Sequence, residues 1–186
     1  MDTQLYTVTV YSENQVGLLN QISIIFTRRR LNIESLSVSA SAIEGIHKFT
    51  ITVVTDRGTV EKAVRQIEKR IEVVKAFFYT DDEIIYQEVA LYKVPTEKLL
   101  GNSRIEEMVR KYNARILEIN SIYAVIEKSG HPDETQQLFD ELCKFGVLQF
   151  VRSGRVAITR STVEHVSLYI GERENERLHA ENIKSK

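Results

Sequence analysis

The order strand–helix–strand–strand–helix–strand occurs twice along this chain of 186 residues. In the first copy, strands are predicted by alternating or β-branched side chains at residues 5–11, 33–42, 48–54 and 72–80. The first helix is predicted for residues 18–29, where apolar residues recur at helical spacing on one face: Leu18, Leu19, Ile22, Ile25 and Phe26. The second helix has an inward face of Val60, Ala63, Val64, Ile67 and Ile71.

The second copy follows an acidic turn at residues 80–83, which marks the predicted domain boundary. Strands are predicted for residues 84–94, 115–119, 121–127 and 147–159. One helix is predicted from Pro95 to Tyr112, and another carries Leu138, Phe139 and Leu142 on its inward side. Such split βαβ units form a four-stranded antiparallel sheet with two helices on one face.

The sequence therefore predicts an α+β protein of two tandem ferredoxin-like (βαββαβ) domains, at residues 1–80 and 84–160. Domains of this size have small cores, so association with a second copy is expected. Residues 161–186 form a charged tail that we expect to be mobile, with a helix as the alternative from Gly171 onward. Its apolar residues offer either one more strand or a partner contact: Val163, Val166, Leu168, Tyr169 and Ile170.

The charge balance argues against a nucleic-acid partner. The chain has 25 basic and 26 acidic residues, a formal net charge of −1, and it lacks the excess of cations that phosphate binding needs. Its single cysteine, Cys143, is predicted to be a small buried hydrophobic residue. The sequence has no signal-peptide pattern and no apolar run of about 20 residues, so we expect a cytoplasmic protein without a membrane contact.

Residues for catalysis or metal binding do not form a recognisable group in the sequence. The four histidines are scattered, and none stands at metal-ligand spacing with another ligand. A small ferredoxin-fold enzyme of the acylphosphatase kind would need an arginine in the first strand–helix loop, and residues 12–17 contain none. We therefore predict no catalytic residue, no metal ligand and no cofactor in this chain, and the enzyme remains the less favoured alternative.

The first strand–helix loop, SENQVG at residues 12–17, raises a more specific possibility. The N-terminal turn of a helix has unpaired N–H groups and a positive dipole end, which suit a carboxylate. Gly17 leaves room for a ligand to approach the backbone, and Asn14 offers a carbonyl oxygen to an ammonium group. An α-amino acid would fit such a site. The alternative is an ordinary loop, in which Asn14 forms an Asx-turn and Gly17 is left-handed.

The same loop resembles a known family. SENQVGLL at residues 12–19, followed by FTRRRLNIESL at 26–36, is similar to the ACT domain of the regulatory (small) subunit of acetolactate synthase, and RSGRV at 152–156 is similar to the closing strand of that family. The resemblance extends over residues 5–160. It implies a non-catalytic, allosteric subunit in branched-chain amino-acid biosynthesis, which stimulates the large catalytic subunit and confers feedback inhibition by valine or another branched-chain amino acid.

The resemblance also implies where the effector binds. ACT domains of this family pair side by side as homodimers and hold the effector between protomers. Asn14, Gly17, Leu18 and Leu19 would come from one protomer, and Asn32 and Ile33 from its neighbour. Thiamine diphosphate, Mg²⁺ and FAD would lie in the catalytic partner.

The sequence departs from the family pattern at two places. Arg30 stands where the family commonly has glycine, and the tail after residue 160 exceeds the usual ending. An amino-acid sensor of the ACT type acting on a different partner is the closest alternative reading.

Overall fold

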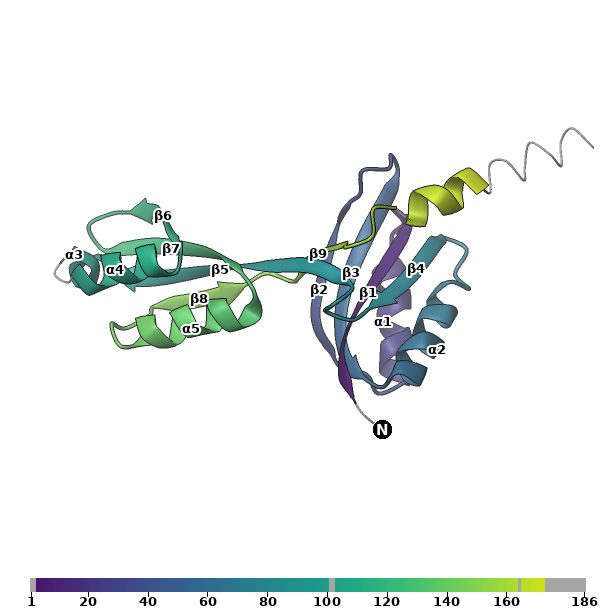
Figure 1. Cartoon of the computed structure of the whole chain (residues 1–186), viewed down its shortest axis with the longest axis horizontal. Helices are drawn as coiled ribbons and strands as arrows, with labels where there is room; N and C mark the ends of the chain where they lie inside the picture. Colours follow the sequence, from purple (N-terminus) through teal and green to yellow (C-terminus); the bar gives the residue numbers. More distant parts are fainter. Residues whose placement is uncertain (1–2, 101–102, 164, 173–186) are drawn as a thin grey trace, which may run out of the picture. The chain divides into compact units, whose positions relative to one another are not determined.

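The computed structural model describes residues 3–100, 103–163 and 165–172, and the chain divides into two compact units (Figure 1). The first unit comprises residues up to Ile85 together with those from Ala157 onward, and the second comprises Tyr86–Val156. The acidic turn predicted as the boundary thus lies inside the first unit. The end of the predicted second domain, residues 157–160, also belongs to the first unit.

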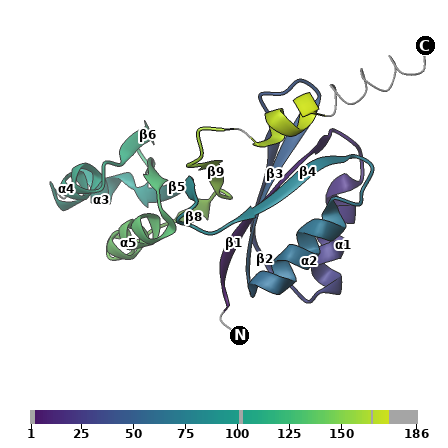
Figure 2. The same ribbon diagram turned by 45° about the vertical axis from the view of Figure 1, so that its right-hand side comes forward.

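The first unit contains one antiparallel sheet of four strands in the order β2-β3-β1-β4. Its elements are β1 (Gln4–Glu13), α1 (Leu18–Arg28), β2 (Ile33–Ala40), β3 (Ile46–Thr55), α2 (Arg57–Ile67) and β4 (Val73–Tyr79). Both helices cover one face of this sheet (Figure 2). The strands β2 and β4 are its edges.

The core of the first unit lies between the helices and the inward side of the strands. Both helices bury most of the stripe that the sequence predicts, with Ile22 and Phe26 of α1 and Val60 and Ile67 of α2 all inaccessible to solvent. The prediction for Leu19 is wrong, since its side chain is 45% exposed. The prediction for Ile71 is wrong. α2 ends at Ile67, so Ile71 lies in the following turn and is 94% exposed.

The second unit repeats the order of the first, with the sheet order β6-β7-β5-β8. Its elements are β5 (Ile84–Pro95, whose first two residues lie in the first unit), α3 (Thr96–Leu100), α4 (Ser103–Lys111), β6 (Arg115–Ile119), β7 (Tyr123–Gly130), α5 (Pro132–Cys143) and β8 (Gln149–Arg152). A further strand, β9 (Val156–Thr159), pairs with β5. The paired strands are antiparallel, which confirms two tandem ferredoxin-like folds of the α+β class.

Two elements of the second unit differ from the prediction. The single helix expected from Pro95 to Tyr112 is divided into α3 and α4, and the single strand expected at 147–159 is divided into β8 and β9 around Gly154. Cys143 is exposed at the end of α5, so the prediction of a buried cysteine is wrong.

The second unit has a core of its own, which shares no residue with the first. Leu138 and Leu142 are buried as predicted, and Phe139 is half-buried, with its ring stacked on Phe150 at 4.3 Å between centroids. Tyr92 is buried, and its hydroxyl donates to the carbonyl oxygen of Thr135 at 2.7 Å. Burial raises the pKa of Tyr92 above its ordinary value, so this phenol remains a hydrogen-bond donor.

The start of the predicted tail is ordered against the first unit. Residues 165–172 are helical, and Val166 is 1% exposed. The alternative of an additional strand is therefore wrong for this segment. The expected mobility of residues 161–186 stays a prediction, and residues 173–186 lie outside the described residues.

Arg30, two residues after the end of α1, has a left-handed backbone, which is unusual for an arginine. Arg30 has φ +56°, its N–H donates to the carbonyl of Thr27 at 2.9 Å, and the next N–H, of Leu31, donates to the carbonyl of Phe26 at 3.0 Å. This pattern is the Schellman ending, at which glycine is preferred. The second unit ends α4 in the same way with Asn113 at φ +49°.

Replacing Arg30 by glycine is expected to stabilise the protein. A non-glycine residue in the left-handed region costs about 1 kcal/mol, and the greater freedom of glycine in the unfolded chain offsets part of the gain. We expect the free energy of unfolding to rise by about 0.5 kcal/mol, measured by urea denaturation. Asn113→Gly is the matched control and should gain less, because asparagine tolerates this region. A less stable Arg30→Gly variant would contradict this account.

Candidate functional site

The loop between β1 and α1 presents an open helix end. Gly17 is the N-cap residue of α1, with φ +86°, and a β-carbon placed there would have no heavy atom within 4 Å. The loop is closed by two backbone hydrogen bonds, from Gln15 to Glu13 at 3.1 Å and from Leu18 to Gln15 at 3.3 Å. The space in front of the α1 backbone is therefore free for a ligand.

The N-terminus of α1 is also uncapped. Among the described residues, no side chain forms a capping hydrogen bond there, and the first turn holds no acidic residue. In contrast, the Asp56 carboxylate caps α2 and accepts from the N–H of Thr59 at 3.0 Å. The hydrogen bond from the Thr59 side chain, together with that N–H, lowers the pKa of Asp56. The helices α3, α4 and α5 each have acidic residues in the first turn. α1 thus keeps a positive end that an anion can compensate.

The predicted site residues of this loop differ in what they can contribute. Asn14 and Gly17 are exposed, and Leu19 is 45% exposed. Leu18 is 1% exposed, so its side chain belongs to the core and only its backbone can meet a ligand. Val16, which is not among the predicted site residues, is fully exposed beside Gly17. The exposure of Val16 is set by the conformation of the turn, and no pattern in the sequence indicates it.

The other two predicted residues lie at the opposite end of α1. Asn32 is exposed, and its amide donates to the carboxylate of Glu34 at 3.0 Å. Ile33 is half-buried and packs against the core of its own unit. The helix between the two sets has 11 residues, about 16 Å at 1.5 Å per residue. The structure therefore does not bring the two sets together within one chain.

The strand that begins at Ile33 is an edge of the sheet. β2 pairs with β3 on one side, and on its other side the order of the sheet ends. Val38 on this strand is 41% exposed. An edge strand of eight residues offers unpaired backbone groups to a second chain.

One further group lies at the end of the sheet where β1 leads into the loop of Gly17. His47 of β3 stands opposite Ser12 of β1, and its Nδ1 is buried without a hydrogen-bond partner among the described residues. A single histidine carries no recognisable spacing, so the sequence did not indicate it.

Clusters typical of metal centres are not found in the described part of the chain: no three His, Cys, Asp or Glu side chains gather there. The buried Glu127 has structural partners instead. It accepts hydrogen bonds from Ser129 and Arg115, and these lower its pKa, with Ser129 contributing most. Each helix in residues 3–100, 103–163 and 165–172 is too short or too polar to cross a membrane.

Comparison with known proteins matches both units to one family. Residues 8–75 match the model of the "AHAS small subunit-like ACT domain", and residues 87–161 match the "Small subunit of acetolactate synthase". The probable acetolactate synthase small subunit of Archaeoglobus fulgidus is 31% identical over 157 residues, which are 83% of this chain and 96% of that protein. The Bacillus subtilis acetolactate synthase small subunit is 28% identical over 165 residues, 88% of this chain and 94% of that one.

A solved structure agrees with these relatives. The crystal structure of the acetolactate synthase small subunit from Thermotoga maritima superposes with a TM-score of 0.78 at 26% identity, over 86% of this chain and 99% of the other. Sequence and fold agree across both units. The chain belongs to the acetolactate synthase small-subunit family.

Proposed function

We propose that this chain is the regulatory subunit of acetolactate synthase in branched-chain amino-acid biosynthesis. It stimulates the catalytic subunit and makes it sensitive to feedback inhibition by valine. The observation that carries the proposal is the match of both units to small-subunit families over nearly the whole of the relatives' length. The open, uncapped end of α1 supports the effector site.

The geometry of the loop suggests how valine binds. Its carboxylate would accept from the N–H groups that follow Leu18 in the first turn of α1, at the positive end of the helix dipole, since the N–H of Leu18 already donates to Gln15. Gly17 allows the close approach, and the Asn14 side-chain oxygen would accept from the ammonium. The exposed Val16 and Leu19 would contact the aliphatic side chain.

A second protomer would complete the site. Since Asn32 and Ile33 lie at the far end of α1, they would reach an effector only in a neighbouring copy. Pairing of two chains through their β2 edges would extend the sheet. The effector then binds between protomers and favours one arrangement of the pair over another.

The proposal assigns the chemistry to the large catalytic subunit, with thiamine diphosphate, Mg²⁺ and FAD, in a cytoplasmic complex. The described residues of this chain offer no cluster of three metal-ligating side chains. The role of this chain is to couple effector binding to the activity of the catalytic subunit. A coupling free energy of about 1–3 kcal/mol changes activity or affinity roughly 5- to 150-fold.

The test is reconstitution with the large subunit. Acetolactate formation should increase when this chain is added and decrease when valine is then added, and calorimetry should show valine binding to this chain. Valine binding without association with the large subunit would favour an ACT-type sensor of another partner. Turnover of acyl phosphates by this chain alone would favour a small ferredoxin-fold enzyme.

The isolated protein is expected to be a dimer or larger, because two small units and an unpaired β2 edge favour association. Light scattering at micromolar concentration should give at least twice the chain mass of 21.4 kDa. A monomer of 21.4 kDa, with and without valine, would contradict the shared site.

A further inference from the structure

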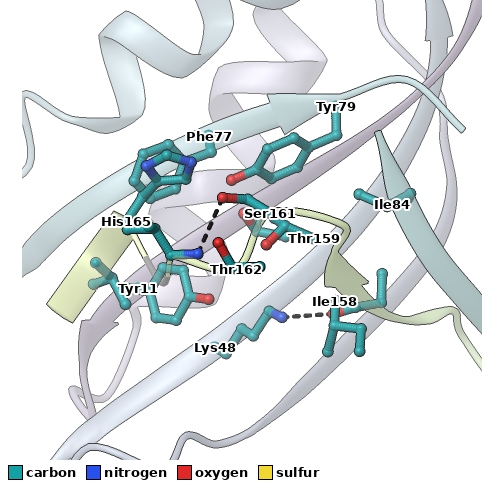
Figure 3. A pocket seen from close by; sticks show the side chains of 14 residues that line it. Tyr11, Lys48, Phe77, Tyr79, Ile84, Ile158, Thr159, Ser161, Thr162 and His165 are labelled. Atoms are coloured by element: carbon teal, nitrogen blue, oxygen red, sulfur yellow. Dashed lines mark hydrogen bonds between the residues drawn. The ribbon is translucent and has the colours of Figure 1, made fainter. Parts of the chain in front are cut away.

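The first unit contains a cavity on the sheet face away from its helices. Thr9 and Tyr11 of β1 alternate with the core residues Val8 and Val10, so they point to the opposite face. There, together with residues of β3 and β4, they form the floor of a cavity of about 240 Å³. Its roof is formed by residues 157–159, 161–163, 165 and 166, of which Ile158, Ser161 and His165 are labelled in Figure 3.

The roof is attached to the floor at both ends. The Lys48 Nζ donates to the carbonyl of Ala157 at 2.7 Å. At the other end, the His165 ring lies 5.9 Å from the ring of Phe77, and Val166 is buried. Beyond the cavity, Lys75 lies over the Tyr169 ring at 5.2 Å. The cavity therefore exists only because the C-terminal segment folds back onto this face.

Hydrogen-bond donors are concentrated in the cavity wall. The ammonium of Lys48 carries three N–H donors, and Tyr79 and Ser161, both labelled in Figure 3, add hydroxyl groups to the wall. Burial, followed by the nearby Tyr11 and Glu83, raises the pKa of Tyr79 to about 12, so its hydroxyl stays protonated. Hydroxyls of Thr9 and other threonines complete the polar part of the wall.

The rest of the wall is apolar, from Phe77 and Ile84 to Ile158 and Val163. The volume is below the roughly 300–1,000 Å³ of sites for drug-sized molecules, so the cavity suits a ligand of about ten non-hydrogen atoms. A cavity wall that contains a cation, hydroxyl donors and apolar groups matches a molecule with one anionic end and one apolar end.

We propose that this cavity is a second ligand site, which takes a small organic monocarboxylate and lies apart from the α1 end. The carboxylate meets the Lys48 ammonium, and the apolar body lies against Phe77 and the roof. Part of the roof, after residue 161, is outside the range that matches the family models. The site is therefore a property of the extended C-terminal segment of this chain, and it does not depend on valine regulation.

The test is calorimetric titration of the full chain with benzoate, and with benzamide as its uncharged counterpart. Benzoate is expected to bind in the millimolar range or more tightly, and benzamide at least tenfold more weakly. Equal binding of the two, or no binding of benzoate, would overturn the proposal.

Variants locate the binding. Lys48→Met keeps the aliphatic stem and should weaken benzoate binding at least tenfold. Tyr79→Phe leaves the contact between Lys48 and Ala157 in place and should weaken it severalfold. Lys62→Met makes the same change of charge on the exposed side of α2 and should have no effect. Unchanged thermal melting would show that the variants remain folded.

Valine titration of the same variants separates this site from the proposed function. Both cavity variants should bind valine as the parent chain does, because α1 lies on the other face of the sheet. Benzoate that binds normally to Lys48→Met and Tyr79→Phe but fails to bind Gly17→Asp would place it at the α1 end and overturn the proposal. Benzoate binding with no valine binding would leave the cavity site standing and contradict only the proposed function.

Discussion

Replacing Gly17 by aspartate is expected to abolish valine binding and to leave an active, valine-resistant complex. The new carboxylate would stand at the uncapped end of α1, where the ligand carboxylate is proposed to bind. Like charges brought together in an interface cost several kcal/mol, so we expect affinity to fall at least about 100-fold. Calorimetry measures this loss, and an assay with the large subunit should show that stimulation largely persists.

The control for this variant separates charge from backbone strain. Gly17 has φ +86°, so any side chain there costs about 1 kcal/mol of stability, although the space for a β-carbon is open. Gly17→Asn has the same shape and a similar tolerance of this backbone, but no charge. It should lower stability at least as much, because it lacks the carboxylate that favours the N-terminus of a helix, and it should weaken valine binding much less. If Gly17→Asp stays valine-sensitive, the loop is only a turn.

The fold could be predicted because hydrophobic periodicity reports it directly. Because each element buries one face, apolar residues recur with a period of two in β1 and with a period near 3.6 in α1. Both copies of the unit show the same order of strands and helices. The errors lie at element ends. Ile71 continues the apolar spacing of α2, but the helix stops at Ile67 because the chain must return to β4. Cys143 reached the surface because it is the last residue of α5.

The candidate site could be predicted only in part. Gly17 at a strand–helix junction is a local signal, whereas the unusual position of Arg30 was indicated only by the family resemblance, in which glycine is common there. Which side chains the turn exposes is not local: Leu18 turns into the core, whereas Val16 is exposed. The cavity could not be predicted from the sequence, because it forms between β1 and a segment about 150 residues later in the chain.

The two units bury separate sets of side chains, which lets the effector site and the remainder of the chain be tested independently. The core around Ile22 and Phe26 belongs to the first unit, and the core around Tyr92 and Leu138 belongs to the second. The proposed valine site lies wholly in the first unit and its copy. A substitution that destabilises the second core should therefore reduce stimulation of the catalytic subunit and leave the affinity for valine unchanged.

Replacing Leu138 by alanine is expected to destabilise the second unit by about 2–5 kcal/mol, because a side chain with no solvent exposure is removed from a packed core. This loss is a large part of the stability of a small domain, so stimulation of the large subunit should fall sharply at 37 °C. Valine affinity, measured by calorimetry, should stay within about twofold, which is less than 0.5 kcal/mol. Leu148→Ala is the matched control: Leu148 is 57% exposed, so stability should change by less than about 0.5 kcal/mol and stimulation should be retained. If Leu138→Ala lost valine binding together with stimulation, the two units would act as one, and the assignment of the effector site to the first unit alone would be wrong.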